Sequence, residues 1–206
     1  AFLTQTVACA HSRCTLSETT GRRTFDLRRG RISVPGAFYF ITFCTRRRTP
    51  VLNTPATHEA GGEVCRRLSA DGDVTSFTST IMPDHVHLLF RLGARLSLSR
   101  VVAKWRAGLT RAVPDVSWQS NFFDHRLHPG EDPEHYAWYA FMNPYCAGLV
   151  SLDESWAGWW LDGETNWEFL SHARPGPSPL PEWLDVFEGI ARRLNTSESD
   201  KGLPGD

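Results

Sequence analysis

The most informative stretch of the sequence is IMPDHVHLLF, residues 81–90. The strand-like run that follows Pro83 and Asp84 predicts a β-strand near 85–92. Side chains at positions i and i+2 of a strand point to the same face, so His85 and His87 project together. Two neighbouring imidazoles suit a divalent cation, although a pair of surface histidines on a half-exposed strand would carry the same pattern.

The segments around this stretch alternate between strand-like and helix-like patterns. Residues 37–45 (AFYFITFCT) are aromatic and β-branched, and residues 97–112 carry apolar side chains at helical spacing. In chain order we expect a strand at 37–45, a helix at 56–70, strands near 74–82 and 85–92, a helix at 97–112, an irregular strand at 118–128 and a helix at 131–143 that Pro144 ends. This order predicts an α+β, ferredoxin-like split βαβ fold, an antiparallel sheet with its helices on one face.

The ends of the chain have a different character from its middle. The polar first residues predict a flexible N-terminal arm at 1–24, followed by one domain at 25–165. Residues 166–206 form a C-terminal extension, in which we expect a short helix at 182–194 and a disordered tail.

Composition narrows the class of protein. Hydrophobic residues make up 41% of the chain and charged residues 22%, as in soluble globular proteins. No apolar run approaches the roughly 18 residues of a membrane span, and the first residues lack the features of a signal peptide. The five cysteines include no C-x-x-C pair, which predicts reduced thiols in a cytosolic protein rather than a zinc site.

Charge is distributed unevenly along the chain. Residues 1–111 hold 17 basic and 7 acidic residues, whereas residues 112–206 hold 5 basic and 16 acidic residues. This asymmetry predicts either a polyanionic partner on the basic side or mutual neutralisation of the two halves.

A second group of polar residues lies on the predicted helix at 131–143. Tyr139 and Asn143 are spaced i, i+4 and share a helix face. A phenol is a weak nucleophile at its ordinary pKa of about 10, but it becomes useful where a metal polarises the phosphate it attacks. The alternative is a buried tyrosine packed beside Trp138 or Phe141, with Asn143 as a helix C-cap.

Three motifs together resemble a known family. IMPDHVHLLF, WQSNFFDH (118–125) and YAFMNPYCAGLV (139–150) are similar in order and spacing to the motifs of Y1-type HUH transposases of the IS200 group. The nearer likeness is to the REP-associated tyrosine transposases, and it covers about residues 25–160, so the domain at 25–165 is expected to be the catalytic one.

The resemblance implies a reaction and its residues. His85, His87 and Asn143 match the ligands of a divalent ion, Mg²⁺ or Mn²⁺, and Tyr139 matches the catalytic tyrosine. The implied activity is cleavage and strand transfer of single-stranded, hairpin (REP-like) DNA through a 5′-phosphotyrosine intermediate. His125 matches a family histidine to which we assign no role, except that it could serve as a structural hydrogen-bonding group. A bacterial cytoplasmic, nucleoid-associated protein that acts as a monomer or homodimer is implied as well.

Binding to DNA needs cations that neutralise phosphates. The expected contacts are Arg46, Arg47, Arg48, Arg100, Lys104 and Arg111, with further basic residues at 22–31. Each of the residues on the 97–112 helix could equally belong to a solvated helix face.

The chain departs from the family pattern at several positions. Tyr145 and Cys146 stand where a basic residue is usual, and Tyr136 is a rival nucleophile. Asp84 adds a negative charge near the expected metal, which would tighten ion binding but repel DNA. Two other functions therefore stay open: an inactive, domesticated hairpin-binding protein, and a small metal-dependent hydrolase for which Tyr139 is dispensable.

Overall fold

The computed structural model describes residues 32–187, and the predictions for the N-terminal arm, the basic stretch at 22–31 and the C-terminal tail lie outside the described residues. The helices and strands up to residue 146 follow the predicted order, whereas the strand at 159–161 and the helix at 168–172 were not predicted. The elements are β1 Phe38–Cys44, the 3-10 turn η1 Arg46–Arg48, α2 Pro55–Ala70, β2 Val74–Ile81, β3 His85–Leu92, α3 Leu98–Ala112, β4 Phe123–Arg126, α4 Pro133–Cys146, β5 Trp159–Leu161 and α5 Glu168–His172. None of the helices between residues 32 and 187 combines the length and hydropathy needed to span a bilayer.

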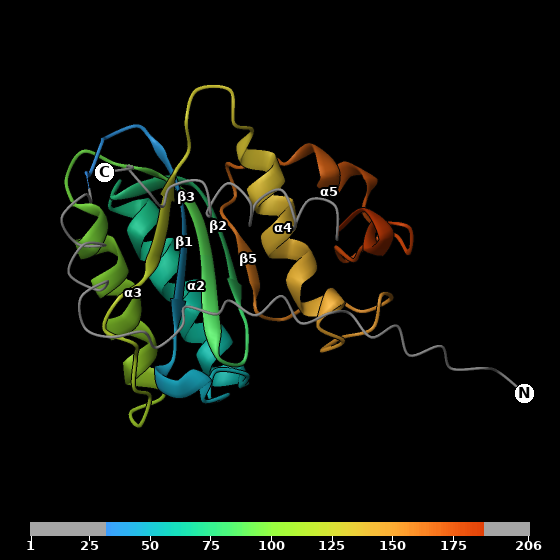
Figure 1. Ribbon diagram of the computed structural model, residues 1–206, viewed down its shortest axis with the longest axis horizontal. Coiled ribbons are helices and arrows are strands. Elements are labelled where there is room, and N and C mark those ends of the chain that lie inside the picture. The colour runs from blue at the N-terminus through green and yellow to red at the C-terminus, as the bar shows by residue number, and fades with distance from the viewer. Residues whose placement is uncertain (1–31, 188–206) are drawn as a thin grey trace, which may run out of the picture.

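The strands form one antiparallel sheet in the order β4-β1-β3-β2-β5, with β3 at its centre (Figure 1). β1 and β3 are buried along nearly their whole length because elements cover both faces of the sheet. Their register sets Cys44 opposite His85 and Thr42 opposite His87. The α+β class with an antiparallel sheet is thus confirmed.

One face of the sheet packs against α2 and α3 (Figure 1). Val86, Leu88 and Phe90 of β3 join the core on this face with Trp105 of α3. A Cβ atom at Gly61 would collide with the Ile81 side chain, so the glycine that weakens α2 as a helix former permits its close approach to the sheet.

The opposite face is covered by α4 (Figure 1). The expectation that the helices share one face holds for α2 and α3, whereas α4 packs on Phe40 and Leu89 from the other side. A helix that is apolar nearly all round must be covered on more than one side. The sheet covers one side of α4, and aromatic residues that follow it in sequence cover another; they include Trp167, Phe169, Trp183 and Phe187.

α4 continues through Pro144 to Cys146, so the prediction that the proline ends the helix was wrong. Proline has no N–H, and the carbonyl of Ala140 therefore lacks its usual helical donor. The hydroxyl of Thr80 on β2 donates to this carbonyl at 2.8 Å. A side chain of the sheet thus supplies the missing hydrogen bond and ties α4 to β2.

Candidate active site

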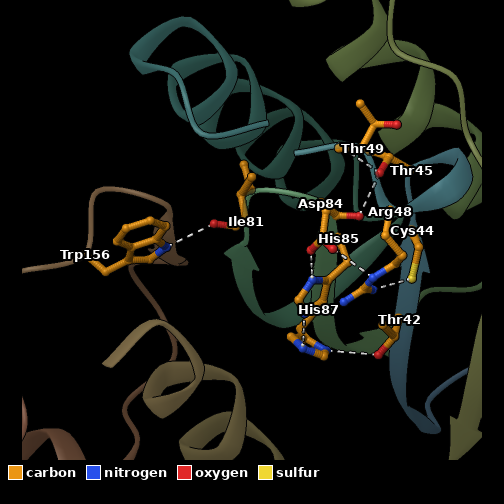
Figure 2. Close-up of polar contacts among 10 residues, drawn as sticks. All are labelled: Thr42, Cys44, Thr45, Arg48, Thr49, Ile81, Asp84, His85, His87 and Trp156. Atoms are coloured by element: carbon orange, nitrogen blue, oxygen red, sulfur yellow. Dashed lines mark hydrogen bonds and ion pairs between the residues drawn. The ribbon is translucent and has the colours of Figure 1, made fainter. Parts of the chain in front are cut away.

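The two histidines of β3 share one face of the sheet, as predicted, and this is the face that α4 covers. They are buried rather than at the surface, with 9% of His85 and 5% of His87 exposed. Their Nε2 atoms are 3.1 Å apart (Figure 2). Two adjacent octahedral ligands about 2.1 Å from one ion would lie about 3.0 Å apart. The pair therefore fits a shared divalent ion.

The other ring nitrogens have partners of different kinds. Nδ1 of His85 lies 2.7 Å from Oδ1 of Asp84, and Nδ1 of His87 lies 2.9 Å from Oγ1 of Thr42. A carboxylate only accepts, so His85 donates from Nδ1 and keeps a lone pair on Nε2. A hydroxyl both donates and accepts, so His87 can turn either a proton or a lone pair toward His85. Such outer partners fix the tautomer of a metal-binding imidazole.

Burial lowers the pKa of both imidazoles. For His85 the carboxylate of Asp84 opposes this effect, and the pKa is still lowered. For His87 the loss of hydration, the neighbouring His85 and the charge of Arg48 act together, and the pKa falls well below its usual value. The same burial would raise the pKa of Asp84, but the hydrogen bond from His85 and the charge of Arg48 lower it. Neutral imidazoles beside an ionised aspartate are the protonation state that binds metal.

Tyr139 of α4 lies against this pair. The centroids of the Tyr139 and His87 rings are 5.6 Å apart in an edge-to-face arrangement. Phe40 of β1 contacts both rings, at 5.5 Å from His87 and 5.9 Å from Tyr139. Phe187, in the short helical stretch at 183–187, stacks on the tyrosine ring at 5.4 Å. The phenol from α4 and the imidazoles from β3 are therefore neighbours within one chain.

Tyr136, the rival nucleophile, is held in a different network. Its hydroxyl donates to Oε1 of Glu131 at 2.8 Å, and its ring packs on Phe40 and His125. Nε2 of His125 lies 2.9 Å from the same carboxylate oxygen. Burial alone would raise the pKa of Glu131, but hydrogen bonds from the His128 N–H, Tyr136 and His125 lower it. His125 thus has the structural hydrogen bond that was one interpretation of it, at the loop that leads into α4.

Asn143 lies one turn after Tyr139 and is tied to it. Its side-chain nitrogen donates to the Tyr139 carbonyl at 2.8 Å, which leaves the amide oxygen as the atom that could bind a metal. Among residues 32–187 no three or more His, Cys, Asp or Glu side chains gather into a metal cluster. An ion on the two imidazoles would therefore need ligands of another type, and Asn143 stays the predicted one.

The predicted DNA-binding residues fall into different settings. Arg46 and Arg47 are exposed at the end of β1, whereas Arg48 turns inward to Asp84. On α3, Lys104 is committed to Asp73 at 2.6 Å. The two remaining residues, Arg100 and Arg111, are exposed on the same helix. α3 packs on the face of the sheet opposite Tyr139.

Three polar partners of the site were missed by inspection of the sequence. Thr42 supports His87, Thr80 holds α4 beside Tyr139, and Glu131 anchors Tyr136. Thr42 left one signal, a hydroxyl inside the buried run FYFITFC. Thr80 and Thr42 both pair with His87 across the sheet, and this register cannot be seen in any one strand.

Part of the chain matches a known protein family. Residues 33–121 match the model of the family described as transposase IS200 like. The resemblance to IS200-like transposases is confirmed. The matched region contains β1 to α3 with both histidines, and Tyr139 lies beyond it. No curated protein matches the sequence.

The solved structures that are similar to the chain include two transposases. One is a REP-associated tyrosine transposase bound to a REP hairpin, at 19% identity and a TM-score of 0.52, over 67% of this chain and 93% of that one. The other is a candidate transposase from Deinococcus radiodurans R1, at 16% identity and a TM-score of 0.39, over 59% of this chain and 97% of that one. The first match confirms the fold, an α+β arrangement that the chain shares with that structure.

Proposed function

We propose that this protein cleaves single-stranded hairpin DNA and transfers the cut strand through a 5′-phosphotyrosine at Tyr139. The observation that carries the proposal is the position of the Tyr139 ring, 5.6 Å from the ring of the buried His87. The likeness to IS200-like transposases supports a transposase-type function on DNA.

The proposed step is an exchange of phosphodiester bonds. The phenolic oxygen of Tyr139 attacks phosphorus, and its proton passes to solvent. The bond from phosphorus to the 3′ oxygen of the preceding nucleotide breaks, and that oxygen leaves as a 3′-hydroxyl after taking a proton from solvent. Attack by a 3′-hydroxyl on the phosphotyrosine reverses or redirects the step. The phosphotyrosine intermediate retains the energy of the broken phosphodiester bond, so no nucleotide cofactor is needed.

A divalent ion fits the donor set of the site. His85, His87 and Asn143 would hold Mg²⁺ or Mn²⁺, which would supply Lewis-acid polarisation of the phosphodiester. All three ligands are neutral, so the positive charge of the ion stays available to the phosphate. The spacing of the two Nε2 atoms and the fixed Nδ1–H of His85 support this assignment.

Hairpin DNA is the proposed substrate because the structural relative at a TM-score of 0.52 is bound to a REP hairpin. Arg46 and Arg47 are the proposed phosphate contacts nearest the site, since they are exposed where β1 ends and β1 pairs with the histidine strand. Because α4 packs against β3 of its own chain, one chain supplies both Tyr139 and the histidines, which supports action as a monomer. A nucleoid-associated location follows from this function.

The test is formation of a covalent adduct. The protein is incubated with a labelled hairpin oligonucleotide carrying a single-stranded flank, with Mn²⁺ or with EDTA, and resolved on a denaturing gel. We expect an adduct in Mn²⁺ that is absent in EDTA and absent in Tyr139→Phe. Tyr136→Phe is the matched control, which should keep the adduct because its hydroxyl is bound to Glu131.

The other functions predict different gels. A hairpin-binding protein without activity shifts the oligonucleotide on a native gel and forms no adduct with any variant. A hydrolase cleaves without an adduct, and Tyr139→Phe retains the cleavage. An adduct that survives Tyr139→Phe and disappears in Tyr136→Phe would transfer the nucleophile to Tyr136.

A further inference from the structure

We propose that Asp84 and Arg48 form a positioning pair that holds His85 as a metal ligand, and that Arg48 is not a DNA contact. This inference rests on the proposed metal site, and it assigns Asp84 and Arg48 a role different from the ones expected from the sequence. Asp84 is a positioning residue because it acts through His85 and not on the substrate.

A continuous series of polar contacts links His85, Asp84, Arg48 and Cys44 (Figure 2). Nδ1 of His85 lies 2.7 Å from Oδ1 of Asp84, and Oδ2 of Asp84 lies 2.8 Å from Nε of Arg48. Nη1 of the same guanidinium donates to Sγ of Cys44 at 2.9 Å. Cys44 lies opposite His85 in the pairing of β1 with β3, so the series of contacts begins and ends at two residues that are strand partners.

The backbone is shaped to turn Arg48 inward. Arg47 and Arg48 both adopt φ of 56°, a left-handed conformation that is strained for residues with a side chain. Thr45, just before the turn, donates from its N–H and its hydroxyl to the Asp84 carbonyl, at 2.9 Å and 3.1 Å. The hydroxyl of Thr45 also lies 2.8 Å from the Thr49 carbonyl. These bonds tie η1 to the β2–β3 turn, and Arg48 becomes half-buried while Arg47 stays exposed.

The pair has two consequences for the site. The carboxylate accepts the Nδ1 proton of His85, which leaves Nε2 as a lone pair directed at the neighbouring imidazole. Arg48 neutralises the carboxylate, so Asp84 does not place an uncompensated negative charge where a phosphate would approach. The repulsion of DNA that was expected from the Asp84 charge is therefore offset by Arg48.

The test measures Mn²⁺ affinity on the full chain without DNA, by titration calorimetry or by electron paramagnetic resonance of the free ion. Asp84→Ala and Arg48→Ala should each weaken Mn²⁺ binding about tenfold or more, as the loss of outer-shell partners does elsewhere. Asp84→Asn should lose less than Asp84→Ala, because an amide oxygen still accepts from Nδ1. Adding Arg48→Ala to Asp84→Asn should cost little more, since Arg48 acts through the carboxylate.

Arg47→Ala is the matched control in the same turn. It should leave Mn²⁺ affinity within about twofold of wild type and weaken hairpin binding in EDTA. Arg48→Ala should instead weaken Mn²⁺ binding and leave hairpin binding in EDTA unchanged. The proposal is overturned if Arg48→Ala leaves Mn²⁺ affinity unchanged, if it weakens hairpin binding in EDTA as much as Arg47→Ala, or if the wild-type protein binds no Mn²⁺.

A measurement on the wild-type protein keeps the proposal testable if the variants misfold. Long-range proton–nitrogen NMR of the imidazoles in the metal-free protein should find the His85 proton on Nδ1, and a proton on Nε2 instead would overturn the proposal. Neither measurement uses DNA cleavage. An absent adduct would therefore sink the proposed reaction and leave the positioning pair standing, and unchanged Mn²⁺ binding in the variants would do the opposite.

Discussion

On the face of the sheet that meets α2 and α3, strand β3 contributes Val86, Leu88 and Phe90, whereas on the α4 face it contributes His85, His87 and Leu89. The first face is an apolar core. The second face is also lined by apolar residues such as Phe40 and Leu89, and among them it holds the two imidazoles and the Tyr139 phenol. Alternate residues of one strand thus contribute to the core on one face and to the candidate site on the other. Substitutions on the first face should mainly lower the free energy of unfolding, and substitutions of the histidines should mainly reduce adduct formation.

The largest effects are expected from two single variants, Leu88→Ala for stability and His87→Ala for adduct formation. Leu88 is fully buried in the apolar core, so its truncation should lower the free energy of unfolding by about 2–5 kcal/mol. His87→Ala should remove adduct formation and cost about 1 kcal/mol of stability. Urea unfolding followed by tryptophan fluorescence and the adduct assay below the transition measure the two. A folded Leu88→Ala protein that forms no adduct would break the division.

A smaller effect is expected at the contact between the sheet and α4. Thr80→Val removes the donor to the Ala140 carbonyl and should cost about 1–3 kcal/mol. Because this carbonyl follows Tyr139 directly, adduct formation should also slow by at least about tenfold.

The neighbouring Ser79→Ala is the matched control for Thr80→Val. Ser79 points to the apolar face, where its hydroxyl lies 3.5 Å from Sγ of Cys65, and its loss should cost less than about 1 kcal/mol with no change in adduct rate. Equal adduct rates in Thr80→Val and Ser79→Ala would show that α4 is positioned by other contacts.

The smallest effect concerns the basic residues of α3. Lys104 is 2.6 Å from the fully buried Asp73, and this hydrogen bond raises the pKa of the lysine. Lys104→Met should lower stability by about 1–2 kcal/mol, since the lysine end is half exposed and screened. Hairpin affinity should stay within about twofold, because the charge is neutralised and lies on the face opposite Tyr139. A shallower dependence of hairpin binding on salt in Lys104→Met would instead make Lys104 a phosphate contact.

Much of the fold could be predicted because its signals are local. The H-V-H alternation, the helical spacing in residues 98–109 and the positions of the turns gave the order of elements. The side of the sheet that α4 covers could not be predicted in this way, because it depends on the path of the chain after β4. The prediction at Pro144 was wrong for a similar reason. The hydrogen bond that the proline cannot donate to the Ala140 carbonyl is supplied by Thr80, a residue 64 positions before Pro144.

The candidate site divides along the same line. The sequence by itself determined that His85 and His87 share a face and that Tyr139 and Asn143 share another, because strand and helix periods of 2 and 3.6 residues act within one element. Only the tertiary structure decided that the phenol meets the imidazoles, that Tyr136 is engaged by Glu131, and that one of three consecutive arginines turns inward to Asp84. These are contacts between elements, and they depend on strand register and on packing across the sheet, which no local pattern contains.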